Sequence, residues 1–198
     1  MFLSGRSDQL QAGSSMHRWA AASSALGAFA VPPLSDPRAR LADLPLGDEA
    51  GATLRYMRSF VDQAIADPAQ ATRNQALALY QGLPPRDYLA EAAAAQAFVR
   101  DQIRYVRDPV ETELVQAPQR TLQVGQGDCD DKATLLAALL KATGHPVRFV
   151  ALALNGGPLS HVLVETKVGS DWHAAETIIP VPFGWYPPGV TSSYVLKV

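Results

Sequence analysis

The sequence contains a single cysteine, Cys129, among its 198 residues, and it has no apolar run long enough to cross a bilayer. One cysteine excludes an internal disulfide and a zinc site built on cysteines, so nothing indicates an oxidising compartment. We therefore expect a protein without a membrane span, whose one thiol is either buried or reactive.

Clusters of basic residues are also missing. The formal net charge is −2, with 17 Lys and Arg against 19 Asp and Glu. Without a basic patch the sequence lacks the electrostatic signature of nucleic-acid binding, and we expect no nucleic-acid partner. With 47% hydrophobic residues, the chain is long enough for one sizeable core and an appendage.

Residues 17–30 have the faint outline of a signal peptide, because a basic start at Arg18 precedes a run of Ala, Ser and Leu that ends in small residues. Ser23 and Gly27 interrupt this run, which begins well inside the chain. We interpret the stretch as a weakly amphipathic helix or an extended arm rather than as a signal peptide.

Prolines and apolar spacing divide the chain ahead of Cys129. Four prolines between positions 31 and 47 forbid a continuous helix, so we expect residues 1–47 to be an arm or linker. Apolar residues at offsets 0, 3, 7 and 11 predict a helix over 48–66, and a second helix from Pro68 to about Tyr80 completes a helical extension over 48–85. The predicted buried face of the first helix comprises Leu54, Met57, Val61 and Ile65.

Residues 86–198 are expected to form the main domain. A helix is predicted over 87–105, and its apolar face contains small alanine side chains that let another element approach closely. The segment 110–124 is predicted to be mostly extended. After the cysteine the apolar period changes from 3.6 to 2, and a buried helix against an antiparallel sheet predicts an α+β fold. The apolar face of this helix comprises Tyr88, Ala92, Ala95, Val99 and Ile103. The predicted strands are 147–154, 161–165 and 172–179.

Cys129 lies where a glycine-rich turn becomes a helix. Asp128 has the spacing of an N-cap and Asp131 completes a capping box, while Gly144 marks the helix end. In the first helical turn, free N–H groups and the macrodipole favour a thiolate, which suits a nucleophile. Two interpretations oppose this one: a lone cysteine is often a small buried hydrophobe, and the flanking Asp128, Asp130 and Asp131 repel a thiolate.

His161 and Glu176 are the candidate partners of the thiol. His161 enters a predicted strand from a glycine-rich turn, and Glu176 follows 15 residues later on the adjacent strand, so both side chains can lie on one face. A thiol, an imidazole and a carboxylate in this order form the constellation of an activated cysteine nucleophile. The alternatives are a polar residue at a strand start for His161 and a surface carboxylate for Glu176.

Four sequence elements together resemble the core of the transglutaminase-like cysteine enzymes, over about residues 86–180. The order and intervals of these elements carry the resemblance rather than any one of them. The elements are Gly127-Asp-Cys129 before a Leu/Ala helix, Gly144-x-Pro146-x-Arg148, His161-x-x-x-Glu165 and Trp172-x-x-x-Glu176.

A second resemblance is to the short versions of these enzymes encoded by tailed phages and prophages. The residues that carry it run from Asp108 and Pro109 through Leu114 to the cysteine turn. This similarity implies either the cytoplasm of a bacterial host or a phage virion as the location of the protein.

The family resemblance implies a papain-like fold and a triad acting on amide bonds through a thioester. It assigns Cys129 as nucleophile, His161 as base and Glu176 as the orienting carboxylate. The sequence departs from the family where Glu176 replaces the usual Asp and where Leu163 replaces an aromatic residue. Both departures put efficient catalysis in doubt, not the fold.

Gln123 and Gln126 are candidate oxyanion donors together with the backbone N–H of Cys129, although either can be an ordinary polar loop residue. We expect no cofactor. A metal site on the acidic residues beside Cys129 is disfavoured because adjacent helix positions do not converge on one ion.

Two functional hypotheses result. The first is a cysteine-dependent amide hydrolase or acyl transferase with a protein or peptide substrate. The second is a phage virion or assembly component that uses the same fold as a binding module and contacts other virion proteins through the arm over 1–47.

Overall fold

The structure is a computed structural model that describes residues 38–40, 49–109 and 114–198, all within one compact unit that spans 33–198. The signal-like stretch over 17–30 and most of the predicted arm over 1–47 lie outside these residues. The described part contains five α-helices and a four-stranded antiparallel sheet, so the predicted α+β class is confirmed.

Helix α6, Cys129–Ala142, is central to the fold. The predicted capping box is present, because the Asp128 side chain accepts from the N–H groups of Asp130 and Asp131, and the Asp131 carboxylate accepts from the N–H of Asp128. Every residue from 130 to 140 is buried, as the Leu/Ala composition predicts. The helix ends before Gly144, whose φ of 91° only glycine adopts readily.

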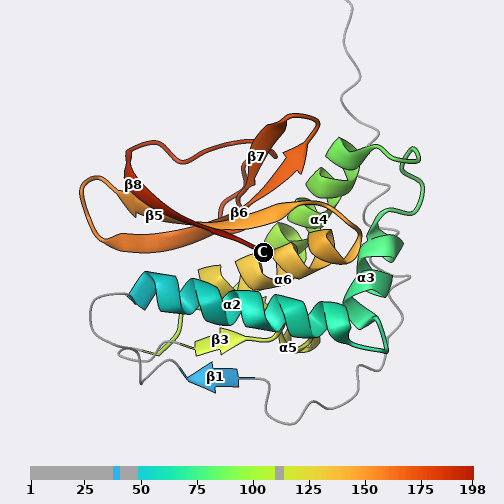
Figure 1. Ribbon diagram of the computed structural model, residues 1–198, viewed down its shortest axis with the longest axis horizontal. Helices are drawn as coiled ribbons and strands as arrows, with labels where there is room; N and C mark the ends of the chain where they lie inside the picture. Colours follow the sequence, from blue (N-terminus) through green and yellow to red (C-terminus); the bar gives the residue numbers. More distant parts are fainter. Residues whose placement is uncertain (1–37, 41–48, 110–113) are drawn as a thin grey trace, which may run out of the picture. The chain divides into compact units, whose positions relative to one another are not determined.

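The main sheet has the strand order β7-β6-β5-β8, and each neighbouring pair is antiparallel. In Figure 1 this sheet lies across α6, with helix α2, Glu49–Ala66, on the other side of α6. The third predicted strand ends at Ala175 instead of 179, and the carbonyl oxygen of the next residue, Glu176, bonds to helix α4, Tyr88–Gln102, instead of to a strand. The strands are β5 Val147–Leu154, β6 Leu159–Val168, β7 Asp171–Ala175 and β8 Val190–Lys197.

Alternation along the strands divides the apolar side chains of the sheet between two clusters. Val162, Val164 and Ala175 belong to the large core that includes α6, whereas Leu163 and Ala174 belong to a small second cluster. Leu163, which replaces the aromatic residue of the family pattern, is therefore a fully buried core residue.

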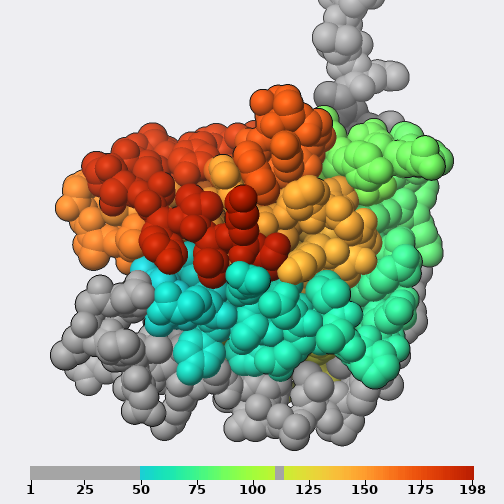
Figure 2. Space-filling model, in the orientation of Figure 1, coloured from blue at the N-terminus to red at the C-terminus, as the bar shows by residue number. Residues whose placement is uncertain are grey.

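Three further helices surround α6: α2 Glu49–Ala66, α3 Ala71–Leu79 and α4 Tyr88–Gln102. Most positions of the two predicted apolar faces are buried, but Ile65 and Tyr88 are exposed. At this end of the helix Ala64, one residue earlier, faces the core in place of Ile65. In Figure 2 the surface of α2, in cyan, meets the dark red surface of the C-terminal strand.

No helix among the described residues combines the length and the apolar character needed to cross a membrane.

The segment before Cys129 differs from its prediction as extended chain. It contains strand β3, Leu114–Gln116, and helix α5, Pro118–Val124. Pro118 opens the helix at its first turn, and Gly125, with φ of 64°, ends it. A strand β1, Arg38–Arg40, pairs with β3 inside the stretch predicted as linker, and β2, Arg104–Tyr105, pairs in parallel with β4, Gln126–Gly127.

Candidate active site

Cys129 is the first residue of α6 and is partly exposed. Its sulfur accepts a hydrogen bond from the backbone N–H of Val162, the residue after His161. The thiol S–H donates a hydrogen bond to the Asp130 carboxylate, with 3.5 Å between Sγ and Oδ1. The structure thus places the thiol against the main chain of strand β6, at the residue that follows the candidate base.

Electrostatics around Cys129 hold the thiol in its neutral form. Burial raises the pKa of Cys129, and the carboxylates of Asp130 and Asp128 raise it further, while the Val162 N–H opposes them. These effects exceed the stabilisation of a thiolate that the helix N-terminus predicts. The resting sulfur therefore carries a proton that a base must remove before or during attack.

His161 and Glu176 are joined by a hydrogen bond of 2.6 Å between Nε2 and Oε2. The predicted contact between these side chains is therefore confirmed. The Glu176 side chain is only 3% exposed, which contradicts its interpretation as a surface carboxylate. His161 lies near the start of β6, opposite Leu152 of β5.

The protonation of the pair follows from its surroundings. Burial opposes ionisation of Glu176, but His161 and the backbone N–H groups of Ile178 and Thr177 outweigh burial and lower its pKa. An ionised carboxylate only accepts hydrogen bonds, so Nε2 of His161 must carry the shared proton. In the neutral imidazole, Nδ1 is then the nitrogen able to accept another proton.

The two oxyanion candidates lie on the approach to Cys129. Gln123 is exposed in the last turn of α5. The side-chain oxygen of Gln126 accepts a hydrogen bond of 2.6 Å from the Arg104 guanidinium. The Asp128 carboxylate accepts hydrogen bonds from the N–H groups of Asp130 and Asp131. A role for either glutamine as oxyanion donor stays a prediction.

Asp131 has a second role that its spacing did not reveal. Besides completing the capping box, its carboxylate accepts hydrogen bonds from the backbone N–H and the side chain of Gln116. Burial raises the pKa of Asp131 to about 6, against these hydrogen bonds, which lower it. One carboxylate therefore joins the first turn of the cysteine helix to β3.

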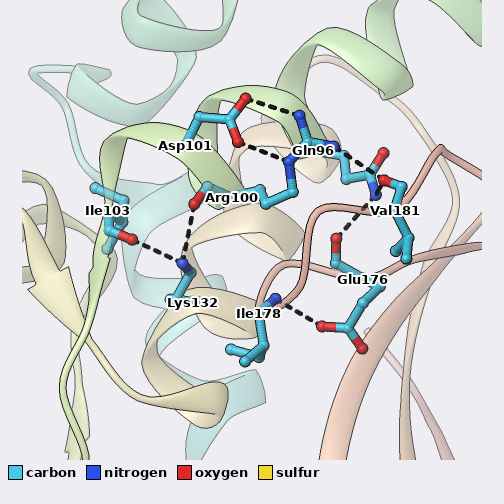
Figure 3. A network of polar contacts seen from close by, with 8 residues as sticks. All are labelled: Gln96, Arg100, Asp101, Ile103, Lys132, Glu176, Ile178 and Val181. Atoms are coloured by element: carbon cyan, nitrogen blue, oxygen red, sulfur yellow. Dashed lines mark hydrogen bonds and ion pairs between the residues drawn. The ribbon is translucent and has the colours of Figure 1, made fainter. Parts of the chain in front are cut away.

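Sequence reasoning missed two buried polar residues beside the site, Gln96 and Lys132 (Figure 3). Lys132 is 1% exposed and donates to the carbonyl oxygens of Ile103 at 2.7 Å and Arg100 at 3.3 Å. Desolvation lowers the pKa of Lys132 to about 8, although Asp101 and Glu176 favour its charge. The available signal was a lysine three residues after the cysteine, at the start of a helix composed mainly of Leu and Ala.

The fold is α+β, and the candidate site combines a thiol on a helix N-terminus, a histidine on a strand and a buried carboxylate. The family model described as the transglutaminase-like superfamily matches residues 75–187, more than half of the chain. The protein belongs to this superfamily, and its predicted papain/transglutaminase-like fold is confirmed. Among curated proteins none matches.

Solved structures give similarity at the level of the fold. A protein from Parabacteroides distasonis, provisionally named a protease, aligns with a TM-score of 0.50 and 13% identity, over 66% of this chain and 26% of that one. A provisionally named cysteine protease from Cytophaga hutchinsonii aligns with a TM-score of 0.44 and 17% identity, over 78% of this chain and 52% of that one. LapG of Legionella pneumophila aligns with a TM-score of 0.45 and 18% identity, over 68% of this chain and 80% of that one.

The chain thus spans about a quarter of the first of these structures and about half of the second. None of the three is named as a phage protein. The resemblance to phage-encoded versions stays a prediction.

Proposed function

We propose that this protein is a cysteine-dependent amide hydrolase acting on a protein or peptide through a thioester on Cys129. The observation that carries the proposal is the 2.6 Å hydrogen bond from His161 to the buried Glu176. The second support is the hydrogen bond to the Cys129 sulfur from the N–H of Val162, the residue after His161. The name given to the Parabacteroides protein agrees with this class of reaction.

His161 acts as a general base in the proposed reaction because the thiol is neutral at rest. Nδ1 takes the thiol proton as the sulfur attacks the amide carbon, and the carbonyl oxygen becomes an oxyanion. The imidazolium then protonates the leaving amine, which leaves a thioester. In the second half, water loses a proton to Nδ1 and attacks the thioester, and the departing sulfur regains a proton from the imidazolium.

Glu176 orients this base and offsets the positive charge that forms on it. The carboxylate is held on Oε1 by the Ile178 N–H at 2.6 Å, so Oε2 stays directed at His161. The longer side chain of Glu relative to Asp is accommodated because Glu176 lies just beyond the end of β7, where the backbone is no longer fixed by strand pairing. This departure from the family pattern is therefore compatible with a working triad.

The test is to incubate the purified protein with a mixture of unmodified peptides and to analyse products and intact protein by mass spectrometry. We expect new peptide termini and a transient mass increase on Cys129, both lost in Cys129→Ala. Added hydroxylamine or a primary amine distinguishes transfer from hydrolysis, because the acyl group then ends on nitrogen. Absence of cleavage and of any adduct with a peptide aldehyde would contradict the proposal.

The assembly hypothesis relies on the arm over 1–47, most of which lies outside the described residues. No contact within the described residues favours it over the enzyme. It gains support only if the peptide test fails while the full chain binds other virion proteins.

A further inference from the structure

Glu176 is held in place by its main chain as well as by its carboxylate. It is the first residue after β7, since pairing with β6 ends at Ala175. Its carbonyl oxygen accepts a hydrogen bond of 2.8 Å from the side-chain amide of Gln96, which comes from α4 and is 1% exposed. The residue that directs His161 is thus anchored by a helix 80 positions earlier in the chain.

The same helix anchors the chain that follows Glu176. Gln96 also reaches the carbonyl oxygen of Val181, at 3.4 Å, and the Arg100 guanidinium donates to that same oxygen at 2.9 Å. Figure 3 shows Gln96 and Arg100, one turn apart, both directed at this segment. Of these two side chains, Gln96 is the one bonded to Glu176 itself.

Helix α4 is in turn fixed to the cysteine helix. The ammonium of Lys132, on the first turn of α6, binds the carbonyl oxygens of Arg100 and Ile103, where α4 ends. A helix C-terminus presents carbonyl groups without intrahelical partners, so a buried cation satisfies them well. One end of α4 therefore contacts both the helix that carries Cys129 and the segment that carries Glu176.

We propose that Gln96 is a positioning residue that fixes the backbone of Glu176 so that its carboxylate meets Nε2 of His161. The inference rests on the function proposed above for the same site. Orienting groups must be held within about 0.5 Å of their productive position. Glu176 lacks the strand pairing that would otherwise supply this precision. A buried amide donating to its carbonyl oxygen supplies it instead.

The test compares Gln96→Met with the matched control Arg100→Met. Both remove a donor to Val181, but only the first removes the donor to Glu176. Two quantities are measured: the downfield proton resonance of His161 Nε2–H, and the pH profile of Cys129 alkylation by iodoacetamide. For Gln96→Met we expect the resonance to shift or broaden and alkylation at pH 7 to slow by roughly 10-fold or more. Arg100→Met should stay within about twofold of wild type.

Equal effects of the two variants, or unchanged values in both, would refute the proposal and leave Gln96 as a packing residue. Thermal unfolding is followed alongside, because a purely structural role lowers the melting temperature without moving the His161 resonance.

If Gln96→Met does not fold, Gln96→Glu decides the question. A protonated glutamic acid can donate to the Glu176 carbonyl and an ionised one cannot. We expect the His161 resonance to be native at low pH and lost as the new carboxyl ionises, whereas a native resonance at every pH would overturn the proposal. The resonance does not require peptide cleavage, so failure of the proposed hydrolase function is distinguishable from failure of this inference.

Discussion

The backbone N–H of Val162 donates a hydrogen bond to the sulfur of Cys129. The nucleophile proposed for this protein therefore contacts the main chain of the strand that carries the proposed base, His161. This contact and the neighbouring carboxylate of Asp130 act in opposite directions on the thiol, the first favouring a thiolate and the second opposing it. Their balance makes the reactivity of Cys129 adjustable by single substitutions.

Replacement of Glu176 by Gln should leave the fold intact and slow alkylation of Cys129 at pH 7 by roughly 10- to 100-fold. The amide keeps the size of the side chain but removes the negative charge that offsets the imidazolium. Iodoacetamide kinetics measure the rate, and circular dichroism checks the fold. Glu165→Gln is the control, because this carboxylate pairs with Arg148 instead of His161. An unchanged rate in Glu176→Gln would remove this residue from the triad.

Replacement of Asp130 by Asn should speed alkylation. The carboxylate of Asp130 raises the pKa of Cys129 both through its charge and by accepting a hydrogen bond from the thiol. Removing it lowers that pKa, so the thiolate fraction and the rate at pH 8 should rise by roughly tenfold. Asp62→Asn, on the exposed face of α2, controls for net charge. A slower reaction would show that Asp130 assists the thiol.

Replacement of Gly127 by Ala should destabilise the cysteine turn. A Cβ atom at this position would lie 2.5 Å from Cβ and 2.7 Å from Oδ2 of Asp131. Asp131 cannot move away without breaking the capping box and its bonds to Gln116. We expect a loss of about 1–3 kcal/mol in urea unfolding. Gly157→Ala is the control, since its Cβ meets only one backbone oxygen, at 3.2 Å. Equal stabilities would contradict the crowding.

Lys132 should make the free energy of unfolding rise with pH between about 8 and 10.5. Its folded pKa of about 8 lies below the ordinary 10.5, so in this interval the unfolded chain binds the extra proton and the folded chain does not. The gain is at most about 3 kcal/mol. Urea unfolding of wild type and Lys132→Met at pH 8, 9 and 10 measures it. The proposed dependence is wrong if both proteins respond alike.

Tyr80 limits the useful range of that experiment. Burial raises its pKa to about 12, so the folded protein keeps this proton above pH 10 while the unfolded chain loses it. Stability contributed by Tyr80 is complete below pH 10 and falls above it. Measurements up to pH 10 therefore exclude the contribution of Tyr80. The raised pKa of Cys129 acts in the opposite direction to Lys132 in this interval, and it cancels in the difference between wild type and Lys132→Met.

Local signals in the sequence predicted the cysteine turn well. Asp128 and Asp131 form the expected capping box because both partners lie within three residues, and Gly144 ends the helix by its own conformational freedom. The His161 to Glu176 contact was accessible because adjacent strands bring such residues together. Helix α5 was missed although Pro118 and Gly125 mark its ends. The polar residues between them suggested extended chain.

Contacts distant in sequence were not predictable. Gln96 donates to the carbonyl oxygen of Glu176 across 80 positions. Nothing in the run of alanines around Gln96 indicates that its side-chain amide binds that oxygen. Lys132 is harder still, since lysine is rarely fully buried and its partners are backbone oxygens, which every residue has. The pKa of Cys129 likewise depends on its burial, which cannot be read from the spacing of residues along the chain.

The bridging position of α4 also bears on how the protein acquires its activity during folding. The helices and hairpins on either side form from neighbouring residues, but the bonds of Gln96 to Glu176 and of Lys132 to Ile103 join positions 80 and 29 apart. Such closures are slow because chain entropy opposes them. In refolding followed by pulse alkylation, the characteristic reactivity of Cys129 should therefore appear after the recovery of helical circular dichroism. The chain acquires its secondary structure first and its chemistry last.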